Sequence, residues 1–393
     1  MGGGTLMVPT WLADLRTGYS LHHARTMPAR RLYHPDPWLI AAVGALLALG
    51  VAMVFNASYF FAQEHYNDPF YFFRRHVAYV VLAVAGAFVV ARIPWTVWER
   101  WAGVMLLGAL AVLAFVLVGG TSEGGARRWV SLKFVPLTVQ PSEFAKTALV
   151  VYLARYLAHR GDKLHWWWGG FLPPVFVSGL VAALLYKQPD FGTAVILLAT
   201  TAAMLYAAGA RRIHMVSLAA VGAVVLLVGI VAEPYRMARV VGFRSAWERA
   251  YGDGYQLVQS MIAVGSGGLW GVGLGASQQK LLYLPAAHTD FILALIAEEM
   301  GLIGVLLVLS LFGVVAWRGF RIALAHEEPF VRLLAAGLVI SLLLEAGLNF
   351  AVVLGMAPTK GLALPFVSYG GSALLGAMLR VGILLHLSRS AGL

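Results

Sequence analysis

Ten long apolar stretches constrain the fold of this chain more than any other feature of its sequence. A helix needs about 20 apolar residues to cross the hydrocarbon core of a membrane, whereas a buried soluble helix is shorter and a barrel strand alternates. An even number of spans places both termini on one side of the membrane. The sequence therefore predicts an all-α, polytopic membrane protein with ten transmembrane helices at 38–58, 76–91, 101–118, 139–157, 169–187, 190–208, 214–232, 291–315, 331–353 and 370–388.

The composition agrees with this prediction and excludes several classes of site. Of the 393 residues, 60% are hydrophobic and 12% are charged, against about 45–50% and about 25% in soluble domains. The absence of cysteine excludes disulfides, thiolate nucleophiles and iron–sulfur clusters. A net charge of +11 would suggest nucleic acid as the partner of a soluble protein. In a membrane protein, cytoplasmic loops and anionic lipids explain such a charge, so we expect no nucleic-acid partner.

Residues 1–37 form a polar segment that leads directly into the first span. A signal peptide would have a shorter apolar region and a small-residue cleavage site, so we predict a cytoplasmic tail and an uncleaved first helix. One ten-helix domain would cover 38–388, with a short cytoplasmic C-terminus at 389–393. The positive-inside rule supports this orientation, because the inner segments carry Arg92, Arg100, Arg160, Lys163, Arg211, Arg212, Arg318, Arg321 and Arg389.

The outer segments also carry basic residues, where few are expected. The longest of them, 233–290, lies between the seventh and eighth helices and is long enough to escape the rule as a solvated surface. The alternative is a cationic outer face that binds an anionic group such as a phosphate or pyrophosphate. The twelve basic residues in question are Arg74, Arg75, Arg127, Arg128, Lys133, Lys187, Arg236, Arg239, Arg244, Arg249, Lys280 and Lys360.

Ionisable residues within a span are functional candidates, because a charge inside the membrane is costly. Glu143 and Lys146 lie three residues apart in the fourth span and share one helix face, so a structural ion pair is the alternative interpretation. Pro141 suits the first turn of this helix, which places the pair one or two turns below the outer surface. We interpret Glu345 and Arg380, in the ninth and tenth spans, as an interhelical pair.

The tight turn between the fifth and sixth helices contains Lys187 and Asp190. Asp190 precedes Phe-Gly-Thr and suits the N-cap of the next helix. The alternative is that Lys187 and Asp190 line the same outward cavity as Glu143 and Lys146.

The end of the long outer segment, 251–290, is rich in glycine and finishes with His288-Thr289-Asp290. Its glycines permit a tightly bent backbone and close approach to a ligand. They do not indicate a dinucleotide-binding motif, because Gly271-Val-Gly273 lacks the preceding strand and the following helix of that fold. Asp290 stands where the chain enters the eighth helix, and it is interpreted either as an N-cap or as a carboxylate that acts as a base. A metal site of His288, Asp290 and a distant carboxylate is a further alternative.

Several motifs follow one another along the chain: Gly125-Ala-Arg-Arg-Trp129, Gln140-Pro-Ser-Glu-Phe-Ala-Lys146, Gln188-Pro-Asp-Phe-Gly192, the run 279–292 and the run 358–372. Their identity and order resemble the SEDS family of cell-wall polymerases over 38–388. Within this family, Pro358-Thr-Lys360, the run 274–283 and Tyr235-Arg236-Met-Ala-Arg239 are more similar to the FtsW branch, which acts in division, than to the RodA branch, which acts in elongation.

The resemblance implies a peptidoglycan glycosyltransferase that polymerises lipid II into glycan strands on the outer face of the bacterial cytoplasmic membrane. Its partner would be a class B penicillin-binding protein, a transpeptidase. At the matching position, Asp290 would be the catalytic residue and would deprotonate the acceptor 4-hydroxyl as undecaprenyl pyrophosphate leaves. Basic residues, with Mg²⁺ or Mn²⁺ as a candidate cofactor, would stabilise the departing charge. The predicted substrate-binding residues are Glu143, Lys146, Arg127, Lys187, Asp190, Gln259, Lys280, His288, Lys360 and Ser368.

Two other functions fit a chain with many spans and charges within them. A transporter that flips lipid II has these features too, although the sequence has no inverted repeat. A scaffold that only recruits the transpeptidase is the third interpretation.

Overall fold

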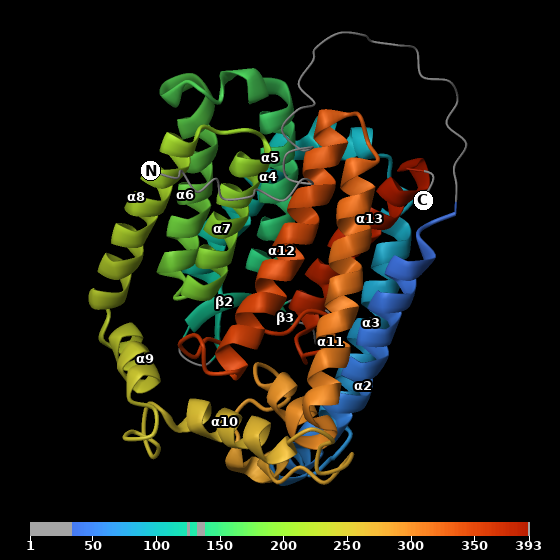
Figure 1. Ribbon diagram of the computed structural model, residues 1–393, viewed down its shortest axis with the longest axis vertical. Coiled ribbons are helices and arrows are strands. Elements are labelled where there is room, and N and C mark those ends of the chain that lie inside the picture. The colour runs from blue at the N-terminus through green and yellow to red at the C-terminus, as the bar shows by residue number, and fades with distance from the viewer. Residues whose placement is uncertain (1–33, 124–125, 132–137, 392–393) are drawn as a thin grey trace, which may run out of the picture.

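The computed structural model of this protein describes residues 34–123, 126–131 and 138–391, whose long helices stand side by side as a bundle (Figure 1). Most of the predicted tail at 1–37 lies outside these ranges, as does Lys133. Eight of the described helices are long and apolar enough to cross a membrane. The ten predicted spans correspond to α2 (Pro37–Tyr66), α3 (Tyr71–Val90), α4 (Trp95–Gly119), α5 (Pro141–Arg160), α6 (Leu172–Lys187), α7 (Phe191–Ala207), α8 (Arg212–Val231), α11 (Ile292–Leu324), α12 (Pro329–Val353) and α13 (Gly371–Ala391).

The prediction of an all-α, polytopic membrane protein is therefore confirmed. Two of the ten helices are less typical spans: α7 has 17 residues, and α5 carries charged side chains. Short helical turns, η1 (Gly161–Lys163) and η2 (Trp167–Phe171), join α5 to α6. The helices α12 and α13 are the most completely buried, whereas α8 stands at the edge of the bundle with apolar side chains exposed around it (Figure 1). An all-round apolar helix of this kind suits contact with lipid.

Both described ends of the chain lie at one end of the bundle, as an even number of spans requires (Figure 1). Asp36 caps α2 by accepting hydrogen bonds from the backbone N–H groups of Trp38 and Leu39, both at 3.0 Å. Its own backbone N–H donates to Ser388 Oγ on α13 at 3.1 Å. Its carboxylate also pairs with Arg318 on α11 at 2.6 Å. This buried contact joins three helices at the same end.

The predicted outer loops are more ordered than expected. The helix α2 continues to Tyr66, so most of the predicted loop 59–75 is helical. Aromatic contacts with α3 stabilise the extension, because Tyr66 stacks on Tyr71 at a centroid distance of 4.1 Å and Phe61 packs against Phe72 at 5.8 Å. The predicted loop 119–138 contains a small antiparallel sheet of β1 (Thr121–Glu123), β2 (Ala126–Ser131) and β3 (Thr138–Val139), in that order.

The long segment between α8 and α11 folds into α9 (Pro234–Arg244), α10 (Tyr255–Gly267) and the turn η3 (Gln279–Tyr283). As expected, its glycines allow tight bends: Gly271 and Gly273 have φ of 83° and 107°. This bent backbone inserts into α11, which breaks at Gly301 with φ 64°. At the break, the Val272 N–H donates to the Glu298 carbonyl at 2.9 Å. The segment is therefore fixed to the bundle.

Candidate active site

Asp290 lies in the turn that precedes α11, at the end of the glycine-rich segment. Its backbone N–H donates to the Ala286 carbonyl at 3.1 Å. The N-cap of α11 is Phe291 and has no side-chain hydrogen bond, so the interpretation of Asp290 as a cap is wrong. Within the part of the chain that the structure describes, no hydrogen bond or ion pair engages its carboxylate, which is partly exposed. A Cβ added at Gly361 would lie 3.0 Å from Asp290 Oδ2, so the backbone of the 354–370 segment lies against this carboxylate.

Two arginines from distant parts of the chain lie close enough to act on the charge of Asp290. Arg128 on β2 is held by the turn before α7, where its Nε donates to the Gln188 carbonyl at 3.0 Å. Arg239 on α9 donates from Nη1 to the Thr359 carbonyl at 2.9 Å. Each guanidinium is anchored by a backbone carbonyl, which orients the group without neutralising its charge.

Two further cations adjoin this pair and rest on aromatic rings. The Arg236 guanidinium lies 4.0 Å from the centroid of the Tyr186 ring and donates to the Gly229 carbonyl at 2.8 Å. Lys360 Nζ lies 4.7 Å from the centroid of the Phe191 ring. Cation–π contact stabilises a positive charge without cancelling it. Among the described residues, no carboxylate forms an ion pair with Arg128, Arg236, Arg239 or Lys360, and we call these four residues the cation cluster.

The electrostatic surroundings shift the pKa values of both kinds of group. Burial raises the pKa of Asp290 to about 6, although Arg239 and Arg128 act in the opposite direction. Burial lowers the pKa of Lys360 to about 8, and Arg239 and Arg236 add to that lowering while Asp190 opposes it. Near neutral pH the site therefore pairs a carboxylate that is unusually basic with an ammonium that is unusually acidic.

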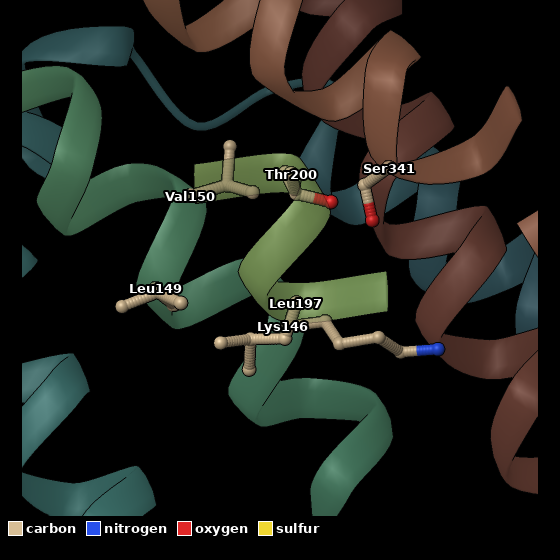
Figure 2. A pocket seen from close by; sticks show the side chains of 6 residues that line it. All are labelled: Lys146, Leu149, Val150, Leu197, Thr200 and Ser341. Atoms are coloured by element: carbon tan, nitrogen blue, oxygen red, sulfur yellow. The ribbon is translucent and has the colours of Figure 1, made fainter. Parts of the chain in front are cut away.

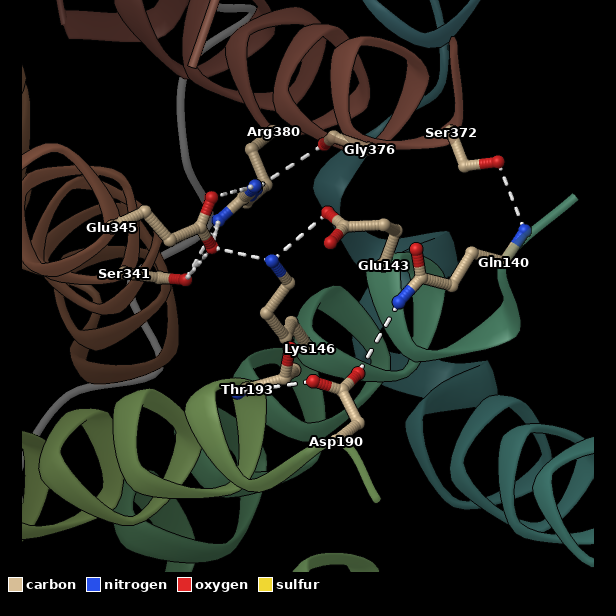
Figure 3. A network of polar contacts seen from close by, with 10 residues as sticks. All are labelled: Gln140, Glu143, Lys146, Asp190, Thr193, Ser341, Glu345, Ser372, Gly376 and Arg380. Atoms are coloured by element: carbon tan, nitrogen blue, oxygen red, sulfur yellow. Dashed lines mark hydrogen bonds and ion pairs between the residues drawn. The ribbon is translucent and has the colours of Figure 1, made fainter. Parts of the chain in front are cut away.

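A second set of charged side chains lies within the bundle, where α5, α12 and α13 meet (Figure 3). Lys146 Nζ lies 2.9 Å from Glu143 Oε2 and 2.8 Å from Glu345 Oε1. Arg380 binds Glu345 from the other side, so the predicted interhelical pair of Glu345 and Arg380 is confirmed. All four side chains are buried, and we call them the buried ion network. The predicted ion pair of Glu143 and Lys146 is thus present, and it forms part of the buried ion network.

Lys146 borders a small cavity between α5, α7 and α12 (Figure 2). Its side chain extends from α5 toward α12, where Ser341 also faces the cavity. The remaining lining consists of the apolar side chains of Leu149, Val150 and Leu197 and the side chain of Thr200, which carries a hydroxyl group. The cavity is therefore part of the bundle interior.

Asp190 caps α7, as one of the two interpretations of the sequence proposed. Its Oδ1 accepts from the Thr193 N–H at 3.4 Å, and its Oδ2 accepts from Gln140 Nε2 at 3.2 Å (Figure 3). Gln140 in turn donates its backbone N–H to Ser372 Oγ at 2.9 Å. Lys187 does not join Asp190 and Lys146, because it is exposed at the last turn of α6. The prediction that these residues line one cavity is corrected accordingly.

Three other predicted binding residues lie in structural contacts or away from the cation cluster. Lys280 is buried in an ion pair with Glu299 at 3.5 Å and donates to Asn56 Oδ1 at 2.8 Å. Ser368 is buried and accepts from the Leu364 N–H at 2.9 Å, which closes a turn. Gln259 is partly exposed on α10 and has no side-chain hydrogen bond to another described residue.

Arg127, a predicted substrate-binding residue, is exposed. Its neighbour Arg128, and not Arg127, is the arginine of β2 that lies near Asp290. Successive side chains on a strand point to opposite faces, so only one of two adjacent residues on β2 can reach the site. The predicted outer cations include Arg128, Arg236 and Arg239, but the sequence does not distinguish them as site residues. The sequence does contain a signal for Arg236 and Arg239. They lie three residues apart just after Pro234, which suits the start of a helix, so both side chains lie on one helix face.

The side chains around Asp290 do not fit a metal centre built by the protein. His288, a candidate ligand, is buried among aromatic rings, with centroids at 4.8 Å from Phe72 and 5.8 Å from Tyr369. Burial lowers its pKa to about 4, so the ring is neutral, which by itself permits metal binding. Within the described residues, no three His, Asp or Glu side chains gather as metal ligands. A site of His288 and Asp290 is therefore not supported, and the Mg²⁺ or Mn²⁺ cofactor remains a prediction.

Comparison with known proteins places these features in a family. A family model described as "Cell cycle protein", which covers FtsW, RodA and SpoVE, matches residues 37–392. Among relatives named "Probable peptidoglycan glycosyltransferase FtsW", that of Trichlorobacter lovleyi is 42% identical and aligns over 91% of this chain and 94% of its own. The Escherichia coli relative is 42% identical over 93% and 88% of the two chains. That of Thioalkalivibrio sulfidiphilus is 44% identical over 90% and 89%.

Solved structures share the fold over nearly the whole chain. The rod shape determining protein RodA of Thermus thermophilus has a TM-score of 0.67 and 29% identity, covering 90% of this chain and 97% of its own. A chain from "Structural coordination of polymerization and crosslinking by a peptidoglycan synthase complex" has a TM-score of 0.75 and 28% identity, covering 91% and 98%. The identity to the FtsW relatives thus exceeds the identity to RodA.

Proposed function

Because this chain belongs to the cell cycle protein family of FtsW, RodA and SpoVE, we propose that Asp290 and the cation cluster are the centre at which it extends glycan strands. The protein is a multi-pass membrane protein and a peptidoglycan glycosyltransferase, and it is more similar to FtsW than to RodA. The substrate that we propose is lipid II, a disaccharide–peptide joined to an undecaprenyl chain through pyrophosphate. The second substrate is the nascent glycan strand or another lipid II molecule.

In the proposed reaction, the Asp290 carboxylate takes the proton of the acceptor sugar 4-hydroxyl. The freed oxygen attacks the anomeric carbon of the donor sugar and forms the new glycosidic bond. The bond between that carbon and the pyrophosphate oxygen breaks, and undecaprenyl pyrophosphate leaves with the electron pair. One positioned carboxylate and a good leaving group suit a single displacement with inversion, without a covalent sugar–enzyme intermediate. The raised pKa of Asp290 favours proton uptake compared with an ordinary aspartate.

The observation that carries this proposal is the set of four anchored cations beside a carboxylate that is not neutralised. Arg128 and Arg239 are oriented by backbone carbonyls, and Arg236 and Lys360 by aromatic rings. Their positive charge is thus available to a ligand. Preorganised cations stabilise charge that develops on a leaving pyrophosphate, and arginine binds phosphate oxygens in a bidentate manner. No step of this scheme is assigned to a metal ion.

The partner and the orientation are also part of the proposal. A family neighbour is described as part of a complex that coordinates polymerization and crosslinking, which supports a class B penicillin-binding protein as the transpeptidase partner. Both described ends lie at one end of the bundle and α9, which carries Arg236 and Arg239, lies toward the other (Figure 1). This arrangement supports a proposal in which both termini are cytoplasmic and the site faces outward in the bacterial inner membrane. The FtsW similarity supports a role in division, and localisation of a tagged protein at the septum rather than the side wall tests it.

The proposed role of Asp290 is tested by polymerisation of lipid II by the purified protein with its partner transpeptidase. The Asp290→Asn variant keeps the size of the side chain but removes the base, so we expect the rate to fall by about 100-fold or more. Asp253→Asn is the matched control, because it removes a half-exposed carboxylate from the same outer segment. Polymerisation by Asp290→Asn at the rate of the unmodified protein would overturn the proposal. Glycan product in detergent, without two compartments, separates a polymerase from a transporter.

A further inference from the structure

Asn349, an uncharged residue on α12, joins the two segments that form the candidate active site. Its Nδ2 donates to the backbone carbonyl of Asp290 at 2.9 Å and to that of Leu362 at 2.6 Å. We propose that Asn349 is a positioning residue that sets the Asp290 carboxylate against the 354–370 segment. This inference rests on the proposed function, because it acts through Asp290.

The chemistry of the contact requires a side chain that donates two hydrogen bonds at this position. Both acceptors are carbonyl oxygens, so the group between them must donate two hydrogen bonds, as an Asn NH₂ group does. The side chain is buried, with 2% of its surface exposed, and its Oδ1 has no hydrogen-bond partner among the described residues. A leucine of similar volume would fill the same space without burying an unpaired acceptor. The amide is therefore better explained by its two bonds than by packing.

The bond to Leu362 fixes the part of the 354–370 segment that contacts the site. Immediately before it, Gly361 lies against Asp290, since a Cβ there would come within 3.0 Å of Oδ2. Lys360 supplies one member of the cation cluster, and the Thr359 carbonyl anchors Arg239. The four successive residues 359–362 thus anchor Arg239, supply one cation, contact the Asp290 carboxylate and accept the hydrogen bond from Asn349.

The helix that carries Asn349 is a rigid base for this function. The side chains of α12 are largely buried, and α12 belongs to the central part of the bundle. One amide on this helix holds the backbone before α11 and the backbone after α12 at a fixed separation. Loss of the amide would let Asp290 and Lys360 move relative to each other. Displacements of about 1 Å can lower the rate of a positioned reaction by about 100-fold.

The test compares steady-state polymerisation of lipid II by the complex of this protein with its transpeptidase. Asn349→Leu removes both donors, and we expect kcat to fall by about 30- to 100-fold while KM changes by less than about threefold. Asn349→Gln keeps two donors on a longer arm, and we expect it to restore kcat at least about fivefold relative to Asn349→Leu. Val352→Ala is the matched control, because it removes buried volume from the same helix without removing a donor. We expect it to keep kcat within about threefold.

The outcomes separate this inference from the proposed function. If Asp290→Asn is inactive and Asn349→Leu has the kcat of the unmodified protein, only the positioning role is overturned. If Asp290→Asn is fully active, the proposed function itself is wrong. Thermal unfolding of each variant, followed by tryptophan fluorescence, shows whether it is folded. Should Asn349→Leu and Val352→Ala lose stability and kcat to the same extent, Asn349 has a packing role only.

Discussion

Arg380 on α13 binds Glu345 on α12 with both ends of its guanidinium, Nη1 to Oε1 at 2.6 Å and Nη2 to Oε2 at 2.9 Å. The same Oε1 accepts from Lys146 on α5, so the carboxylate joins three helices inside the bundle. This geometry suits arginine better than lysine, because the planar guanidinium matches both oxygens of a carboxylate. The contact fixes how α5, α12 and α13 lie relative to one another.

Removal of one member of this network should destabilise the protein strongly. Glu345→Gln leaves the Arg380 and Lys146 charges with one buried carboxylate, and we expect a loss of about 3–5 kcal/mol in unfolding free energy. Asp253→Asn is the control, because its ion pair with Arg249 spans 3.9 Å and is half exposed. That variant should lose less than about 1 kcal/mol. Thermal unfolding in detergent provides the measurement, and equal stabilities of the two variants would contradict the prediction.

Polymerisation should lose activity at mildly acidic pH. Asp290 must be deprotonated to accept a proton, and burial raises its pKa to about 6. We therefore expect kcat/KM to be level above that pH and to fall about tenfold per pH unit below it. Initial rates between pH 5 and 7.5 test this, with samples returned from pH 5 to pH 7.5 to show that the protein stays folded. A constant kcat/KM down to pH 5 is the contrary result.

The alkaline side of the pH profile should depend on Lys360. Burial lowers the pKa of its ammonium group to about 8, so the cation cluster loses one charge above that pH. The rate should decline there, because fewer cations oppose the charge of the leaving pyrophosphate. Lys360→Arg retains its charge throughout this range and should remove the decline between pH 8 and 10 while leaving the acidic limb unchanged. An identical decline in both proteins would assign it to another group.

The two adjacent arginines of β2 should differ in their effect on activity. Arg128 is anchored by the Gln188 carbonyl and lies close enough to Asp290 to act on its pKa, whereas Arg127 is exposed. Arg128→Gln should lower kcat/KM by about 10- to 100-fold, the usual effect of losing a charged hydrogen bond. Arg127→Gln, which has the same charge change on the same strand, should lower it by less than about threefold. Equal losses for the two variants would indicate a general effect of surface charge.

The spans and the charges within them could be predicted from sequence because both depend on local properties. An apolar run of about 20 residues has few alternatives to a transmembrane helix, and a buried charge requires a partner. Hence Glu345 and Arg380 could be paired from their positions in two helices. The N-cap interpretation of Asp190 depended only on the next three residues.

Other parts of the site depend on contacts between segments that are distant in the sequence, so they could not be predicted from local sequence properties. The choice between Arg127 and Arg128 follows from how β2 pairs with β1, where Arg127 lies opposite Ser122, and sequence spacing does not reveal this register. The sequence predicts Lys280 as a ligand-binding residue, because its spacing from Glu299 on α11 gives no sign that the two side chains pair. Asn349 carries no charge, so the cost of burying an ion, which marks Glu345 in the same helix, does not mark it.

The buried ion network has a consequence for how the protein responds to the membrane potential. Two carboxylates, Glu143 and Glu345, and two cations, Lys146 and Arg380, carry no net charge together. The membrane potential acts on a charge with about 2.3 kcal/mol per 100 mV for a full crossing, but it exerts no net force on a neutral group. This network is therefore not a voltage sensor. The free energy for strand extension would come from cleavage of the bond between the donor sugar and its pyrophosphate, and this network would add no dependence on the membrane potential.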